Sequence, residues 1–167
     1  MNYTNLGSAY GRDVYLFTYE DDGNGAPPPD YSAAAVVLKP NWTADALGWM
    51  LNALYGALNE WDGFSPNAGA RSFAFFGERA DAASDLCDVF AYAWTGGDDS
   101  EYDNVVASSH DEGTLDAFVE NMFSGEILAG NEYADNLTSI VFAVQDADQA
   151  GQITPLINAA IERHKAD

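Results

Sequence analysis

Residues 43–61, TADALGWMLNALYGALNEW, carry the clearest helical pattern in the chain. Large apolar residues recur in it every three or four positions, which places them along one face of a helix: Leu47, Met50, Leu51, Leu54, Leu58 and Trp61. Thr43 suits the N-cap, and Asp45 suits the first turn, where the helix dipole favours negative charge. The spacing therefore predicts a central core helix on which the other elements pack.

Two strands are expected before this helix. Residues 13–20, DVYLFTYE, are rich in β-forming residues and are partly apolar on both alternating faces, so they predict a strand. Residues 31–39, YSAAAVVLK, predict a second strand, and we expect it to pair with the first. Residues 1–12 are mostly polar and contain glycine, which indicates a loosely held arm or a short edge segment.

Three further segments follow the helix. Residues 72–77, SFAFFG, and residues 104–109, NVVASS, are short β-rich runs that predict strands. In residues 81–94, DAASDLCDVFAYAW, large side chains alternate with small or polar ones toward the end of the segment. That period of two predicts a turn followed by a strand.

The C-terminal third predicts helix, strand and helix. Residues 115–124 have an apolar stripe that begins after Thr114, a suitable N-cap. Residues 138–144, TSIVFAV, predict a strand. Thr154-Pro155 predicts the start of a last helix, because proline is favoured at the first helical position. Its final turn carries the cations Arg163, His164 and Lys165, which the helix dipole favours there.

The element order is therefore β-β-α-β-β-β-α-β-α. Neighbouring strands in this order favour hairpins, so we expect an α+β fold with an antiparallel or mixed sheet of about five to six strands and three helices packed on it. The chain has 167 residues, which matches one domain over residues 1–167.

Negative charge dominates the composition. The formal net charge is -21, from 27 acidic and six basic residues. From Ala80 to Glu162 there is no Lys or Arg, but there are eleven Asp and six Glu. Hydrophobic content is 47% and aromatic content 13%, whereas a disordered acidic segment would be poor in both. The sequence thus predicts a folded and very acidic protein.

Several function classes are disfavoured. No dinucleotide or P-loop motif is present, so no cofactor is expected, and the charge would repel phosphates and nucleic acids. The acidic loop at residues 98–103 lacks the Gly and Glu of an EF-hand loop, so no metal is expected. His110, His164 and Cys87 form no recognisable catalytic pattern, and we expect no enzyme. Without a visible signal peptide or apolar span, we expect a cytoplasmic protein with no membrane partner.

The charge instead suggests imitation of nucleic acid. Duplex DNA carries about one charge per 1.7 Å, so 21 charges correspond to roughly 36 Å of duplex. A domain of this length is roughly 40 Å across. In size and charge the chain resembles acidic inhibitors of restriction enzymes and CRISPR complexes, which phages and plasmids often encode. No motif carries the resemblance, so it assigns no residue a role. It implies a basic nucleic-acid-binding protein or complex as the partner, in the host cytoplasm if the gene is a phage gene.

Two alternatives stay open. The first is a salt-adapted globular protein of a halophile or its virus, because Asp is abundant and Lys is rare. The second is an acidic chaperone or immunity protein that masks a basic toxin or effector. The oligomeric state is left open, a homodimer included. For a partner-binding surface, the candidate residues are the grouped acids of the Ala80–Glu162 block: Asp98, Asp99, Glu101, Asp103, Asp111, Glu112, Asp116, Glu120, Glu126, Glu132 and Asp135.

Overall fold

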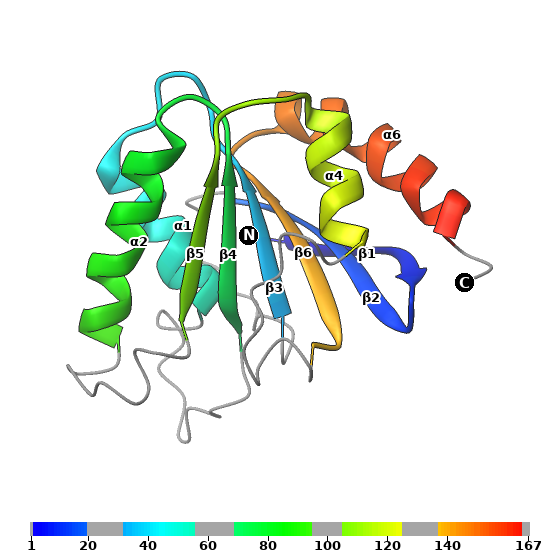
Figure 1. The fold of residues 1–167 in the computed structure, drawn as a ribbon, viewed down its shortest axis with the longest axis horizontal. Helices are drawn as coiled ribbons and strands as arrows, with labels where there is room; N and C mark the ends of the chain where they lie inside the picture. The colour runs from blue at the N-terminus through cyan, green and yellow to red at the C-terminus, as the bar shows by residue number, and fades with distance from the viewer. Residues whose placement is uncertain (1, 20–31, 56–68, 95–104, 125–136, 165–167) are drawn as a thin grey trace.

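The computed structural model describes residues 2–19, 32–55, 69–94, 105–124 and 137–164. These residues form an α+β fold with one mixed six-stranded sheet in the order β1-β2-β6-β3-β4-β5 (Figure 1). The expected class is confirmed, although four helices are described and not three. The elements are β1 (Asn2–Ala9), β2 (Arg12–Thr18), β3 (Ser32–Val37), α1 (Ala44–Tyr55), β4 (Ala70–Phe76), α2 (Ala80–Trp94), β5 (Val106–His110), α4 (Leu115–Ser124), β6 (Ser139–Val144) and α6 (Ala147–His164).

The N-terminal strands form a hairpin at one side of the sheet. β1 is an antiparallel edge strand, so the short edge segment expected as one alternative for residues 1–12 is confirmed. Two residues connect it to β2, and both have positive φ: Tyr10 at 55° and Gly11 at 74°. A two-residue turn of this kind matches the right-handed twist of paired strands.

The remaining strands run parallel. The expected pairing of residues 31–39 with residues 13–20 is wrong, because β6 lies between β2 and β3. β3 pairs with β6 on one side and with β4 on the other. All six residues of β3 and all six of β6 are buried. Strands covered on both faces are typical of parallel pairing, which requires helical crossovers between strands and excludes a simple hairpin.

Helices cover both faces of the sheet (Figure 1). Because side chains alternate along a strand, β3 contributes Ala34 and Val36 to one core cluster and Ala35 and Val37 to the other. Buried residues of α1 and α2 belong to the first cluster, and those of α4 and α6 belong to the second. Both clusters are built on the parallel strands. Because β3 to β6 run in the same direction, their carboxyl ends lie along one edge of the sheet.

Residues 81–94 form helix α2, so the prediction of a turn followed by a strand is wrong. The residues on its inner side are small and recur every three or four positions: Ala80, Ala83, Cys87 and Ala91. Such residues let the helix lie close to the sheet, but they give a weak apolar signal in the sequence. The alternating aromatic residues near the end of the segment give the stronger signal, and alternation is the pattern of a strand.

The last helix begins at Ala147, seven residues before the expected start at Thr154. The Asp146 side chain accepts a hydrogen bond from the backbone N–H of Gln149 at 2.9 Å, as an N-cap does. Pro155 therefore lies inside α6, and Thr154 donates its hydroxyl to the carbonyl of Ala150 at 2.6 Å. A Thr-Pro pair is typical of a helix start. In this helix, however, the N-cap is Asp146.

The central helix follows the sequence closely. α1 spans Ala44–Tyr55, and residues 56–61 of the predicted helix lie outside the described residues. Thr43 accepts a hydrogen bond from the Ala46 N–H at 3.2 Å, which confirms the predicted N-cap. Thr114 caps α4 in the same way through the Ala117 N–H, also at 3.2 Å.

Candidate functional site

Four of the eleven acids predicted to bind a partner are described. Asp111, Glu112 and Asp116 are exposed around the connection from β5 to α4, and Glu120 is half-buried one turn further along α4. The structure thus brings one predicted group to the carboxyl edge of the sheet. The other seven predicted acids lie outside the described residues: Asp98, Asp99, Glu101, Asp103, Glu126, Glu132 and Asp135.

Glu120 is not an unpaired acid. Arg163 lies 2.6 Å from its Oε1, and the Nε2 atom of His164 lies 2.8 Å from its Oε2. Tyr10 reaches the other ring nitrogen of His164 at 2.6 Å. Partial burial raises the pKa of Glu120, but the hydrogen bonds and charges of His164 and Arg163 outweigh this and lower the pKa overall. The cations come from α6, beyond the Ala80–Glu162 block, so sequence proximity did not reveal the pairing.

This network predicts a pH-dependent contribution to stability. A carboxyl group whose folded pKa is lowered stabilises the fold at neutral pH, and this is lost as the pH falls through the folded pKa. Glu120→Gln is therefore expected to reduce the free energy of unfolding by about 1 kcal/mol at pH 7, since the group is partly exposed and screened. The difference from the parent protein should shrink below pH 4.5, the ordinary value for this group.

Urea unfolding at pH 7 and at pH 3 measures this effect. The matched control is Glu112→Gln, which makes the same chemical change at an exposed position. We expect little change for the control at either pH. Equal losses for the two variants at pH 7 would show that the Glu120 network contributes no specific stability.

A second acidic surface was not predicted from the sequence. Asp81, Asp85 and Asp88 follow one another at intervals of four and three residues on α2, so they share one face of that helix. All three are exposed. Val89 is 67% exposed and Tyr92 is 61% exposed on the same side. We call these five residues the α2 acidic face.

The charges of this face repel one another. Partial desolvation, followed by the charge of Asp85, raises the pKa of Asp88. Asp81 accepts a hydrogen bond from Ser109 of β5 at 2.5 Å, which fixes its position against the edge strand. The exposure of Tyr92 places an aromatic ring beside these carboxylates. The signal that could have found the face is the i, i+4, i+7 spacing, which has meaning only in a helix.

The described basic side chains are engaged elsewhere. Lys39 pairs with Asp146 at 2.6 Å, and Arg163 pairs with Glu120. Arg79 lies over the Trp42 ring at 4.2 Å, and Arg71 is buried over Tyr55 at 4.1 Å. Arg12 donates to the carbonyl of Leu137 at 3.4 Å. Within the described ranges, these contacts leave the α2 acidic face without a neutralising cation.

The carboxyl edge of the sheet is hollowed where the chain changes direction. After β3 the chain passes to α1 on one face, and after the adjacent strand β6 it passes to α6 on the other face. Open sheets with helices on both faces form a crevice at such a switch point, outside the carboxyl ends of the strands. We call the hollow between these two connections the edge crevice.

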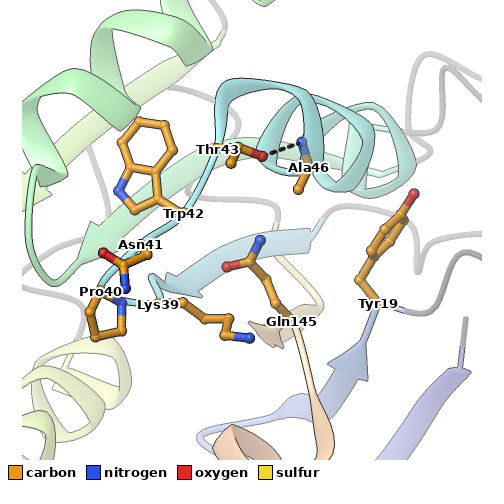
Figure 2. Close-up of a pocket in the computed structure, with 8 residues that line it drawn as sticks. All are labelled: Tyr19, Lys39, Pro40, Asn41, Trp42, Thr43, Ala46 and Gln145. Atoms are coloured by element: carbon orange, nitrogen blue, oxygen red, sulfur yellow. Dashed lines mark hydrogen bonds between the residues drawn. The ribbon is translucent and has the colours of Figure 1, made fainter.

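Two adjoining hollows make up the edge crevice. The first has a volume of about 450 Å³ and the second about 500 Å³, and both are lined by Lys39 and Pro40. Figure 2 shows the first hollow, with Gln145 of the β6–α6 connection facing the residues that lead into α1. Its lining is mostly uncharged: Tyr19, Lys39, Pro40, Asn41, Trp42, Thr43, Ala46 and Gln145.

Hydrogen bonds hold the walls of the edge crevice. The Trp42 indole donates to the carbonyl of Glu78 at 3.1 Å, and Arg79 donates to the carbonyl of Trp42 at 2.6 Å. On the opposite side, Gln149 accepts from the backbone N–H of Gln145 at 2.8 Å and donates to the carbonyl of Val37 at 3.0 Å. The Lys39–Asp146 ion pair joins the two walls, and its hydrogen bond lowers the pKa of Asp146.

The residues considered for catalysis are arranged as ordinary structural groups. Cys87 is fully buried, and burial, with a smaller effect of Asp88, raises the pKa of its thiol, which disfavours the reactive thiolate. The Ser108 hydroxyl lies 2.9 Å from the Nε2 atom of His110, while Ser109 bonds to Asp81 instead. Partial burial lowers the pKa of His110, and its ring packs 5.8 Å from Phe118.

Neither metal ligands nor a membrane segment emerge from the described parts of the chain. There, no three or more His, Cys, Asp or Glu side chains gather as a metal site would require, and no helix is long and apolar enough to cross a bilayer. The acidic loop at residues 98–103 lies outside these parts. Comparison of the chain with protein-family models, curated proteins and solved structures finds no match.

Proposed function

We propose that this protein is a non-enzymatic acidic inhibitor that binds a basic nucleic-acid-handling protein in place of its nucleic acid. The observation that supports this most directly is the α2 acidic face. It presents three carboxylates that no cation of the described residues neutralises, beside two exposed apolar side chains. Charge steers a partner of opposite sign, and aromatic residues are enriched where protein surfaces bind.

The spacing of the carboxylates supports imitation of nucleic acid. A helix rises about 1.5 Å per residue, so Asp81 and Asp88 lie about 10 Å apart along the axis, with Asp85 between them. Three charges over that length give about one charge per 5 Å, against about 3.4 Å per phosphate of one DNA strand. A protein surface that tracks a phosphate backbone with Arg and Lys could therefore pair with this row.

The test is competition for a captured partner. The purified protein is used as bait in host lysate, and the retained proteins are eluted with increasing NaCl and identified. A labelled duplex or single strand is then bound to the captured protein and titrated with this protein. We expect mutual displacement. Simultaneous binding of both, or a captured partner without a nucleic-acid site, would contradict the proposal.

The same assay separates the proposal from the chaperone or immunity alternative. An acidic chaperone would hold a basic toxin or effector by the same attraction. Its target would be released to act elsewhere, or would be blocked at a site unrelated to nucleic acid. Displacement of DNA or RNA from the captured partner is therefore the deciding result.

Salt dependence separates the proposal from the salt-adapted alternative. Repulsion within a chain of net charge -21 opposes folding, and salt screens it with a Debye length of about 8 Å at 0.15 M. We expect the protein to be folded at about 0.1 M NaCl and its melting temperature to rise with further salt. Circular dichroism melts across an NaCl series measure this. A chain that folds only in molar salt would support the salt-adapted alternative instead.

A further inference from the structure

We propose that the edge crevice binds a small, neutral, polyhydroxylated ligand of the sugar class. This goes beyond the proposed function, because the crevice is formed by the β3–α1 and β6–α6 connections and not by the α2 acidic face. Its two hollows, of about 450 and 500 Å³, each have the volume of a small-molecule site. The switch point between β3 and β6 is where folds of this construction place their ligands.

The crevice is organised before any ligand arrives. The β3–α1 connection is held by the bonds of Trp42 and Arg79, and the stacked guanidinium covers the indole ring. The β6–α6 connection is held by Gln149, which bridges Gln145 and Val37. A site whose walls are already fixed loses little conformational freedom on binding.

The charges around the crevice favour a neutral ligand. Lys39 is the cation of the lining, and Asp146 already pairs with it. The first turns of α1 and α6 contain Asp45 and Asp148, which offset the positive ends of these helix dipoles. An anion would meet Asp148, which lines the second hollow, and a cation would meet Lys39, which lines both. A neutral molecule encounters neither penalty.

The polar lining supplies donors and acceptors for hydroxyl groups. Asn41 and Gln145 contribute amides, and Thr43 and Tyr19 contribute hydroxyls. The Oε1 atom of Gln145 is buried and has no hydrogen-bond partner among the described residues. Figure 2 shows this amide facing the hollow below the first turn of α1. A buried polar atom without a partner carries a desolvation cost, so a turn of this amide that brings the atom to a ligand hydroxyl would be favoured.

The experiment uses the purified full chain and a panel of neutral sugars: glucose, galactose, ribose, sucrose and inositol. Binding is followed by the shifts of backbone and side-chain amides in nitrogen–proton NMR spectra. We expect at least one neutral compound to shift the Gln145 side-chain amide and the Thr43 N–H saturably. Gln145→Ala should weaken that binding about tenfold, the effect of losing one or two hydrogen bonds. Asn158→Ala, an exposed change on the far part of α6, should leave it unchanged.

A second variant guards against indirect effects of the first. Ala46→Leu fills the hollow and keeps every hydrogen bond of the walls, so it should block binding while the spectrum stays that of the folded protein. Glucose 6-phosphate and glucosamine test the neutral class. Stronger binding of either charged compound, shifts that map away from the crevice, or no saturable shift with the neutral panel would each overturn the proposal. No partner protein is involved, so the result is independent of the inhibitor proposal.

Discussion

Gly69→Ala is expected to lower the free energy of unfolding by about 4 kcal/mol. Gly69 has a φ of +77°, which costs about 1–3 kcal/mol for a residue with a side chain. A Cβ atom built there would lie 2.3 Å from the carbonyl oxygen of Tyr55 and 2.8 Å from that of Leu54. These are backbone atoms at the end of α1, so they cannot rotate away, and relieving the overlap adds about 1–3 kcal/mol. Urea unfolding followed by circular dichroism measures the loss.

Gly11→Ala is the matched control for this change. Gly11 has a similar φ of +74°, but a Cβ atom there would meet nothing within 4 Å. We expect a loss of about 1 kcal/mol, from backbone strain alone. If the two variants lose the same stability, close packing of Gly69 against the end of α1 is not the cause.

The second large effect concerns binding and rests on the proposed function. Asp81→Asn, Asp85→Asn and Asp88→Asn together should weaken capture of the basic partner by about 2–3 kcal/mol, or roughly 30- to 150-fold. Much of the loss should appear in the association rate and should diminish as salt is added, because steering acts through the long-range field. Surface plasmon resonance at several NaCl concentrations measures both quantities.

The substitution at Asp88 in this triple variant should not reduce folding stability. The raised pKa of Asp88 shows that its charged form is disfavoured in the folded protein, so this carboxylate opposes folding once the pH rises through its pKa. Replacing it with Asn should leave the melting temperature at pH 7 unchanged or higher. A weaker complex together with an intact melt would locate the effect at the surface.

Two comparison variants identify the binding surface. Glu20→Gln, Asp21→Asn and Asp22→Asn remove the same charge outside the Ala80–Glu162 block and should weaken binding less. Equal weakening would mean that net charge alone controls binding. Replacement of the acids of residues 98–103 with Asn or Gln tests the group predicted from the sequence. If that change abolishes binding while the α2 triple variant does not, the interface is the loop and the α2 assignment is wrong.

Much of the secondary structure was accessible from the sequence because it depends on local patterns. The strand at residues 138–144 contains a continuous run of β-forming apolar residues, the helix at residues 115–124 has an apolar stripe at the helical period, and both elements are present. α2 failed because its inner face consists of small residues, while its aromatic residues Phe90 and Trp94 are four positions apart and also fit an alternating pattern. Local pattern alone does not separate these two periods over a short segment.

Strand pairing was less accessible because it depends on contacts far apart in the sequence. The available signal was the lack of polar alternation in SAAAVV and SIVFAV, the sequences of β3 and β6. Strands buried on both faces favour a parallel sheet with helices on each side. The assumption that consecutive strands form hairpins outweighed this signal, and it holds in the described sheet only for β1 and β2.

In the candidate surface, too, the features that depend on local sequence were predicted and those that depend on the fold were not. Acidic composition was visible at once, but the grouping of Asp81, Asp85 and Asp88 requires knowing that the segment is a helix. Glu120 was a candidate for binding a partner, yet it pairs with Arg163 and His164, which lie 43 and 44 residues away in the sequence. The edge crevice depends on where β6 enters the sheet, which no local motif encodes.

The position of β6 has a consequence for folding during synthesis. β2 pairs with β1 and β6, so the N-terminal hairpin has no place in the growing sheet until residues 139–144 have left the ribosome. Nearly the whole chain must therefore emerge before the strand order can be completed. Contacts of such long sequence separation slow folding and keep strand edges open to other chains. Strong net charge of one sign keeps such exposed intermediates apart, so the acidity that we propose for binding would also oppose aggregation of the nascent protein.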